Sequence, residues 1–300
     1  MGILQALEIL SRHKRGPTRR IIFSIRRLIE NGSSFTEAAS AQDRFFTPFE
    51  IAVIQAGERS GRLENNLRFL ADYMEKISSW RRKIIGGMIY PVIILHAAIL
   101  IPPVPILILQ GSIPYVDTVS KSLLWIYGIG FGIFLAVKIS GRIPVISYLR
   151  DYLLQAIPII GGILRRLSMA RFTISLSGSY RAGISIRSSI MFAAAACGNE
   201  YIKRRILKQI RIVETGGQVT EVLQKSKVFP EMVIEMVNTG EETGEMEKML
   251  SKASSYCENK AEAAITILNN TLPVILYLAV ALYVAFKVIS FYAGYFATLE

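Results

Sequence analysis

The sequence contains few of the residues from which most metal and catalytic sites are built. Its 300 residues include only two cysteines, Cys197 and Cys257, and two histidines, His13 and His96. These cannot assemble a convincing zinc site, and two cysteines so far apart are typical of reduced thiols in a cytoplasmic environment. A G-x-x-x-x-G-K-[ST] phosphate loop and an H-E-x-x-H motif are also absent. We therefore expect no cofactor, no metal and no catalytic residues.

Three apolar stretches are long enough to be membrane spans. The chain is 51% hydrophobic yet carries a formal net charge of +12, a combination typical of membrane proteins with basic cytoplasmic parts. A span needs about 20 mostly apolar residues, and we predict spans at residues 84–109, 123–140 and 271–294. Because proline breaks or kinks helices, the proline cluster at 102–105 leaves two paths. The first span ends near Ile101, or it continues after a kink.

The distribution of lysine and arginine orients these spans, because cytoplasmic segments carry the excess of positive charge. Of the 35 lysines and arginines, 15 lie in residues 1–83 and 17 in residues 141–270. The segment 110–120 and the tail 295–300 contain none. We therefore expect a multi-pass protein with a cytoplasmic N-terminus, both basic segments in the cytoplasm, and an external loop at 110–122 and C-terminal tail. Topology alone then explains the basic excess, so we expect no direct nucleic-acid partner.

The two basic segments are copies of each other. A set of residues around a Gly-Glu-x-x-Gly sequence recurs 183 positions later, and a second set upstream recurs at an offset of 184. The corner residues are Gly57, Glu58, Gly61, Gly240, Glu241 and Gly244. Apolar spacings of three and four predict helices on either side, so each copy is expected to be a small antiparallel helical bundle. The second copy has one further helix, residues 169–181, so the first copy either lacks its first helix or begins upstream of Met1.

The corner residues have a structural and a functional interpretation. The glycines can take the left-handed backbone that ends a helix, and the glutamate lies near the first turn of the next helix, where negative charge is favoured. Helix capping or pairing with an arginine is the favoured role, with contact to a partner protein as the alternative. The neighbours Glu241 and Glu242 raise the question of acid–base catalysis. Glu58 has Arg59 beside it instead, which argues against catalysis.

These residues resemble the GspF/PilC family, the inner-membrane platform proteins of type II secretion systems and type IV pili. The shared pattern is a phenylalanine–proline start, an apolar helix, a Gly-Glu-x-x-Gly corner and a leucine-rich helix. It reads FFTPFEIAVIQAGERSGRLENNLRFLADYMEK in the first copy and VFPEMVIEMVNTGEETGEMEKMLSKASSYCEN in the second. A proline early in the following span is also shared, as Pro91 and Pro273.

The resemblance implies an all-α polytopic protein of the bacterial inner membrane, with three transmembrane helices and two homologous cytoplasmic bundles, residues 1–83 and 141–270. The loop 110–122 and the tail 295–300 would then be periplasmic. It implies a non-enzymatic platform, a homo-oligomer in the lipid bilayer with other inner-membrane assembly proteins. The platform would connect a cytoplasmic assembly ATPase to pilins or pseudopilins.

Two other classes of protein remain to be weighed. A transporter or permease subunit is the main alternative, but transporter repeats are often inverted within the membrane, whereas these copies lie outside the spans. A single-copy relative from the tight-adherence pilus systems is disfavoured by the presence of two copies and three spans.

Polar residues within and beside the spans are further candidates. A charge at the bilayer centre costs about 2.5–3.5 kcal/mol or more and usually faces a partner, so His96 and Lys287 could serve helix–helix or pilin contacts. Alternatively, Lys287 extends to the membrane surface and His96 stays neutral in a packed interface. The run at 80–83, Trp-Arg-Arg-Lys, predicts an anchor at anionic lipid, worth about 1 kcal/mol per charge. A surface for an acidic patch of the ATPase is the alternative there.

Overall fold

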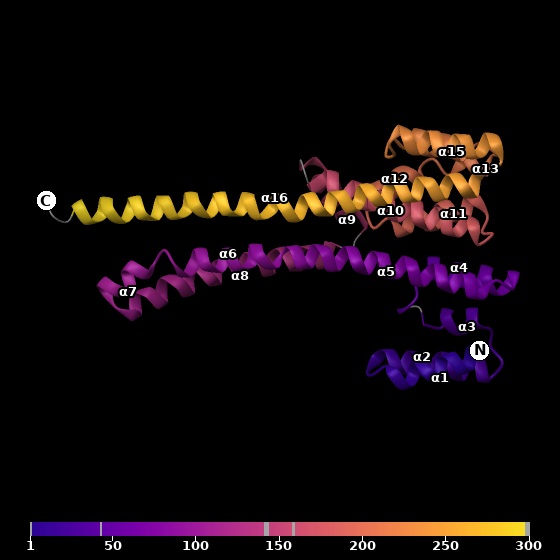
Figure 1. The fold of residues 1–300 in the computed structure, drawn as a ribbon, viewed down its shortest axis with the longest axis horizontal. Coiled ribbons are helices and arrows are strands. Elements are labelled where there is room, and N and C mark those ends of the chain that lie inside the picture. The colour runs from indigo at the N-terminus through magenta and orange to yellow at the C-terminus, as the bar shows by residue number, and fades with distance from the viewer. Residues whose placement is uncertain (1, 43, 141–143, 158–159, 298–300) are drawn as a thin grey trace. The chain divides into compact units, whose positions relative to one another are not determined.

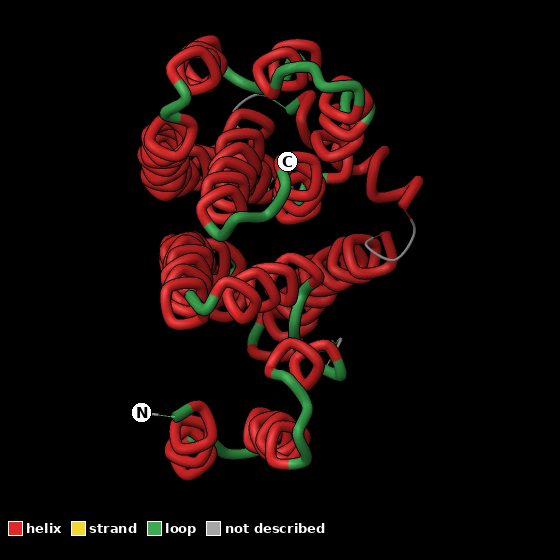
Figure 2. The backbone as a smooth tube through the Cα atoms, turned by 90° about the vertical axis from the view of Figure 1, so that its right-hand side faces the viewer, coloured by secondary structure: helices red, strands yellow, loops and turns green. Residues whose placement is uncertain are grey.

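The structure is a computed structural model that describes residues 2–42, 44–140, 144–157 and 160–297. Every regular element in these four ranges is a helix, and none is a strand (Figure 2). The predicted all-α fold is therefore confirmed.

The chain divides into two compact units. Unit 1 comprises residues 1–77 and 166–259, and unit 2 comprises residues 78–165 and 260–300. Both copies of the repeat fall within unit 1, so the two bundles predicted from the sequence do not form two separate units. The physical reason is that α11 of the second copy packs on α4 of the first.

Unit 1 contains the helices of both copies (Figure 1). The first copy consists of α1 (Ile3–His13), α2 (Pro17–Glu30), α3 (Phe35–Ser40), α4 (Pro48–Ser60) and the start of α5 (Leu63–Gly87). The second copy is preceded by α10 (Ile160–Arg181) and consists of α11 (Ile186–Ala196), α12 (Glu200–Leu207), α13 (Arg211–Glu214), α14 (Val219–Ser226), α15 (Glu231–Thr243) and the start of α16 (Met246–Ala297).

The helix boundaries follow the internal repeat. Helices α1 and α11 both have 11 residues, and α4 and α15 both have 13. Each of these pairs, and the pair α5 and α16, begins 183 residues apart. The counterpart of α2 is broken into α12 and α13 by the turn at 208–210. Helices α3 and α14 begin 184 residues apart, so the change of offset seen in the sequence lies between the first and fourth helices of each copy.

Local sequence signals start helices α3 and α4 of the first copy. Ser34 and Glu37 form a reciprocal capping box at the start of α3, and Thr47 and Glu50 form another at the start of α4. Each box satisfies two backbone N–H groups that have no partner within the helix. Pro48 occupies the first position of α4, where its missing N–H costs nothing.

The core of the first copy is completed by the second. Phe49, Val53 and Leu70 are members of one buried cluster, and Ile184 and Phe192 of the second copy pack against it. This burial of apolar surface from both copies is what holds unit 1 together.

Unit 2 contains the apolar helices. They are the end of α5, α6 (Ile89–Leu100), α7 (Val104–Gln110), α8 (Ser112–Ser140), α9 (Pro144–Ala156) and the end of α16. Three helical segments in the described part of the chain are long and apolar enough to cross a membrane, namely Leu63–Ile108, Ser112–Lys138 and Met246–Phe286. A fourth would be counted only if α9 and α10, which meet at a bend of 120°, formed one broken span. Each of the three predicted spans overlaps one of the three segments.

Two helix boundaries were left open or misplaced by the sequence. Helix α6 ends at Leu100, because the prolines at 102 and 103 cannot donate the next backbone hydrogen bonds. A helix resumes at Val104 as α7 within the same apolar segment, Leu63–Ile108, as in the second of the two predicted paths. The loop predicted at 110–122 is instead helical from Ser112 onward. The polar side chains of this stretch lower its hydropathy, so the sequence did not indicate a helix there. The 2.7 Å ion pair between Lys121 and Asp117 supports the helix.

Candidate functional site

The glutamate of the first corner binds the start of another helix. The carboxylate of Glu58 accepts hydrogen bonds from the backbone N–H groups of Phe35 at 2.8 Å and Thr36 at 3.0 Å, and from the hydroxyl of Thr36. Phe35 and Thr36 are the first two residues of α3. The negative charge therefore satisfies unpaired donors at the positive end of a helix dipole.

The second corner repeats this arrangement. The carboxylate of Glu241 accepts from the N–H groups of Val219 at 2.6 Å and Thr220 at 2.9 Å, and from the hydroxyl of Thr220. These residues open α14, the counterpart of α3. The capped helix is thus the one before each corner, not the following helix that the sequence suggested. The reason is that the chain folds back, so that α3 packs on α4 and α14 on α15.

These hydrogen bonds set the ionisation of Glu58. Partial burial raises the pKa of Glu58, but the bonds from the Thr36 hydroxyl and from the two backbone N–H groups together lower it more. The net pKa of Glu58 therefore lies below its ordinary value, and the residue stays ionised in its capping role.

The corner glycines have two separate functions. Gly61 and Gly244 end α4 and α15 with φ of +69° and +73°, the left-handed conformation that favours glycine. Gly57 and Gly240 instead permit close packing between helices. A Cβ on Gly57 would lie 3.0 Å from a Cα of α5, and one on Gly240 would lie 3.1 Å from a Cα of α16.

No acid pair forms at the second corner. The carboxylate of Glu242 accepts a hydrogen bond from the side-chain amide of Asn238 at 2.7 Å, whereas Glu241 is engaged with α14. The described residues also include no group of three or more His, Cys, Asp or Glu side chains placed to hold a metal ion. All six corner residues have a role inside the fold, and their contact with a partner protein stays a prediction.

A polar seam joins α5, α10 and α16 within unit 1, and sequence reasoning missed it. Lys76 of α5 forms an ion pair with Glu258 of α16. Gly178 of α10 lies against the Phe69 ring, which a Cβ on that glycine would overlap at 1.8 Å, and the Arg181 guanidinium lies 5.3 Å from the centre of the same ring. A cavity of about 200 Å³ lies beside these side chains. The small residues of Ser-Leu-Ser-Gly-Ser at 175–179 were the available signal.

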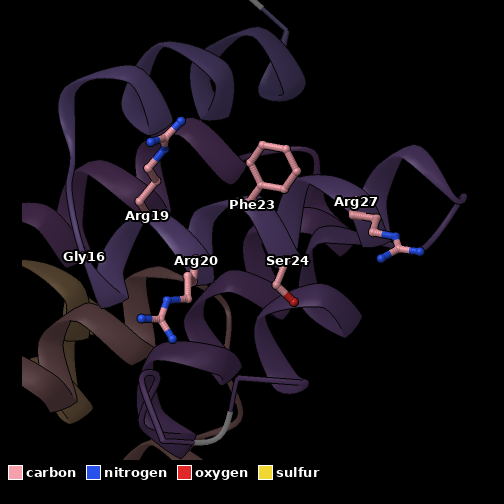
Figure 3. A pocket seen from close by; sticks show the side chains of 6 residues that line it. All are labelled: Gly16, Arg19, Arg20, Phe23, Ser24 and Arg27. Atoms are coloured by element: carbon pink, nitrogen blue, oxygen red, sulfur yellow. The ribbon is translucent and has the colours of Figure 1, made fainter.

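The outer face of α2 is a basic surface with an exposed aromatic ring (Figure 3). Arg19, Arg20 and Arg27 line a shallow pocket around Phe23, whose side chain is 56% exposed. None of the three arginines forms an ion pair within the described ranges, unlike Arg26, which binds Glu30 at 2.7 Å. A macromolecule with negative charge at its surface would complement this face.

Within unit 2, His96 bridges two candidate spans. His96 of α6 donates from Nδ1 to the Val92 carbonyl at 2.7 Å, and its Nε2 lies 2.7 Å from the hydroxyl of Tyr127 in α8. Since one ring nitrogen donates to a carbonyl, a neutral imidazole accepts from Tyr127 at the other. His96 therefore joins α6 to α8, and its role in contacts with pilins stays a prediction.

The two span prolines occupy different positions. Pro91 is buried in the first turn of α6, where a helix does not need its N–H, whereas Pro273 lies inside α16 and removes one hydrogen bond. Lys287 falls within α16, but its side chain lies outside the described residues. The side chain of Trp80 is buried, whereas the three basic residues after it are exposed, so an anchor of the run 80–83 at anionic lipid stays a prediction.

Comparison with known proteins decides the family. A profile of the type II secretion system protein F family matches residues 1–111 and 172–294, which include both corners and the predicted first and third spans. The chain belongs to the type II secretion system protein F family. Together with the three apolar helices, membership of this family indicates an inner-membrane protein.

Curated relatives of this family member come from pilus and secretion systems. The type IV pilus assembly protein TapC of Aeromonas hydrophila is 29% identical, over 98% of this chain and 76% of its own length. The type IV pilus assembly protein PilC of Pseudomonas aeruginosa is 27% identical, over 98% of this chain and 84% of its own. The type II secretion system protein F of Vibrio cholerae is 27% identical, over 83% of this chain and 66% of its own.

Proposed function

We propose that this chain is the non-enzymatic inner-membrane platform of a type IV pilus or type II secretion machine. It couples a cytoplasmic assembly ATPase to the polymerisation of pilins or pseudopilins, in a homo-oligomer with other inner-membrane assembly proteins. The observation that carries this proposal is the pairing of both family corners with long helices. Each capped corner leads directly into a helix, α5 or α16, that includes a candidate span or leads into one.

The proposed topology keeps unit 1 in the cytoplasm, where an ATPase can reach it. The N-terminus and the segments 1–83 and 141–270 are cytoplasmic, and the C-terminus is periplasmic. The charge distribution supports this, because 32 of the 35 lysines and arginines lie in these two segments. Reporter fusions after residues 83, 116 and 260 test it, and a periplasmic signal at 260 would overturn the coupling role.

We further propose that the ATPase binds the basic face of α2. The support is that three arginines without carboxylate partners in the described part of the chain surround an exposed Phe23. Charge complementarity of this kind mainly gives specificity and rapid association. The same guanidinium groups would also attract anionic lipid, so the experiment must separate the two.

The test combines genetics with binding. Cells lacking the gene should lose pili or secretion, and the wild-type chain should restore them. The full-length chain in nanodiscs of neutral lipid should bind the assembly ATPase encoded in the same genome. The variant R19E/R20E/R27E should lose that binding, whereas Arg68→Glu, at an exposed arginine of α5 paired with Glu64, should keep it.

Three results would contradict parts of the proposal. Intact pili and secretion in the deletion strain would remove the platform role altogether. ATPase binding that survives the triple charge reversal would leave the platform role standing but would move the ATPase contact away from α2. Binding that appears only with anionic lipid in the nanodisc would assign the α2 face to the membrane.

A further inference from the structure

The contact between the two copies in unit 1 has a counterpart whose two faces remain exposed among the described residues. Inside the chain, α11 of the second copy packs on α4 of the first, and Phe192 packs against the buried cluster that contains Phe49. The repeat offset of 183 places Ile9 of α1 where α11 has Phe192, and Met232 of α15 where α4 has Phe49. Phe49 is 4% exposed, whereas Ile9 is 43% and Met232 47% exposed.

The difference in exposure extends along the whole helix face. In α4 the stripe Phe49, Ala52, Val53 and Ala56 is buried or half-buried. In α15 the matching stripe is Met232, Glu235, Met236 and Thr239, of which only Met236 is half-buried. Helix α1 matches α11, and α15 matches α4, in length and in repeat offset. The chain therefore presents the two helices of a second such contact, each with its equivalent face exposed.

We infer that a second copy of this chain completes the contact. Helix α1 of one copy docks on α15 of the next, and repeats between chains the contact that α11 makes with α4 within one chain. This contact would be the interface through which the proposed homo-oligomer forms. Only the expectation of an oligomer rests on the proposed function.

Charge supports a second copy as the occupant. The turn after α1 holds Lys14 and Arg15, and the outer face of α15 holds Glu231 and Glu235. All four side chains are exposed, and none forms an ion pair within the described ranges. The basic end of α1 and the acidic face of α15 are therefore complementary in charge.

The contact inside the chain carries no such charges. The counterparts of the two basic residues are Cys197 and Gly198, and those of the two acids are Pro48 and Ala52. The four charges of the proposed contact between molecules are therefore absent from the equivalent positions of the contact inside the chain. Opposite charges at the edge of an apolar contact favour correct pairing and suppress wrong partners.

The geometry of the interface predicts the kind of assembly. It joins two different surfaces, and each chain offers one α1 and one α15. Such head-to-tail contacts form a ring if the rotation closes and an open chain if it does not. A two-fold dimer through α1 alone is not expected.

Disulfide trapping between full-length chains tests the inference. Ile9→Cys and Met232→Cys proteins with different tags are mixed in detergent and oxidised mildly. The native Cys197 and Cys257 are buried and do not interfere. We expect a mixed covalent dimer from the two together and none from either alone. Leu4→Cys, an exposed position on another face of α1, serves as the matched control and should give at least about fivefold less product with Met232→Cys.

Charge reversal gives an independent measurement. Arg15→Glu in the Ile9→Cys chain should reduce the mixed dimer severalfold, and Glu235→Arg in the Met232→Cys chain should restore it. Equal trapping of Leu4→Cys, or homodimers of Ile9→Cys, would overturn the interface. If the chains are oligomeric by mass photometry and no mixed dimer forms, the interface is wrong while self-association stands. ATPase binding measured on the same samples reports the proposed function separately.

Discussion

The two neighbouring glutamates of the second corner allow a sharp test of the capping role. Glu241→Ala removes the carboxylate that holds the first two N–H groups of α14, and Glu242→Ala removes a neighbour that binds only within α15 among the described contacts. We expect the first substitution to loosen the start of α14 and the second to leave it unchanged.

The magnitude follows from the number and kind of hydrogen bonds. Hydrogen bonds to a charged group contribute about 1.5–3 kcal/mol each, and loss of a helix cap costs about 0.5–2 kcal/mol. Water can partly replace the lost acceptor, because the corner is only half-buried. We therefore estimate a loss of about 2 kcal/mol, or roughly a thirtyfold increase in local opening.

Hydrogen exchange on the full-length protein measures this directly. Peptides that cover residues 217–224 should exchange faster in Glu241→Ala, whereas those of α12 should stay at the wild-type rate. Equal exchange at the start of α14 in the Glu241→Ala and Glu242→Ala proteins would refute the capping argument. Glu241 and Glu242 would then again be candidates for contact with a partner protein.

Three further predictions concern ionisation, packing and the membrane helices. Because the folded pKa of Glu58 is lowered, its contribution to stability is present above the unfolded pKa and is lost as pH falls through the folded value. The temperature midpoint of unfolding should therefore decrease as the pH is lowered below about 4.5, the ordinary pKa of a glutamate, and should decrease less steeply in Glu58→Gln. Gly178→Leu should destabilise the protein by about 3 kcal/mol or more, because the added side chain overlaps Phe69. Thermal unfolding in detergent should show a lower midpoint. Tyr127→Phe removes the hydroxyl bound to His96 and should cost about 0.6 kcal/mol, at most about 1.7, in the same assay.

The features that sequence could predict are those with a local cause. The left-handed glycines at the corners, the capping positions before α3 and α4 and the apolar length of the spans all depend on short stretches of chain. The repeat offset of 183 was equally accessible, because it needs no knowledge of contacts.

Features that depend on pairing between distant segments could not be predicted. The sequence indicated that Glu58 caps a helix, but the helix is α3, which lies 22 residues upstream and meets the corner only after the chain folds back. The ion pair between Lys76 and Glu258 joins residues 182 positions apart, and no periodicity marks either one. Hydropathy also failed at Ser112–Ser122, where i,i+4 pairing extends α8 through a polar stretch.

The duplication itself separates residues that the fold requires from residues free to serve partners. Glu58 and Glu241 make the same three hydrogen bonds, so their identity in both copies is explained by capping alone. The exposed positions beside them differ, since Arg59 is replaced by Glu242. A partner that distinguishes the two copies in unit 1 must contact such differing positions, because the corner motif is the same in both copies. Determinants of assembly should therefore be sought where the copies diverge, on α1, α2 and α15, and not in the motif that identifies the family.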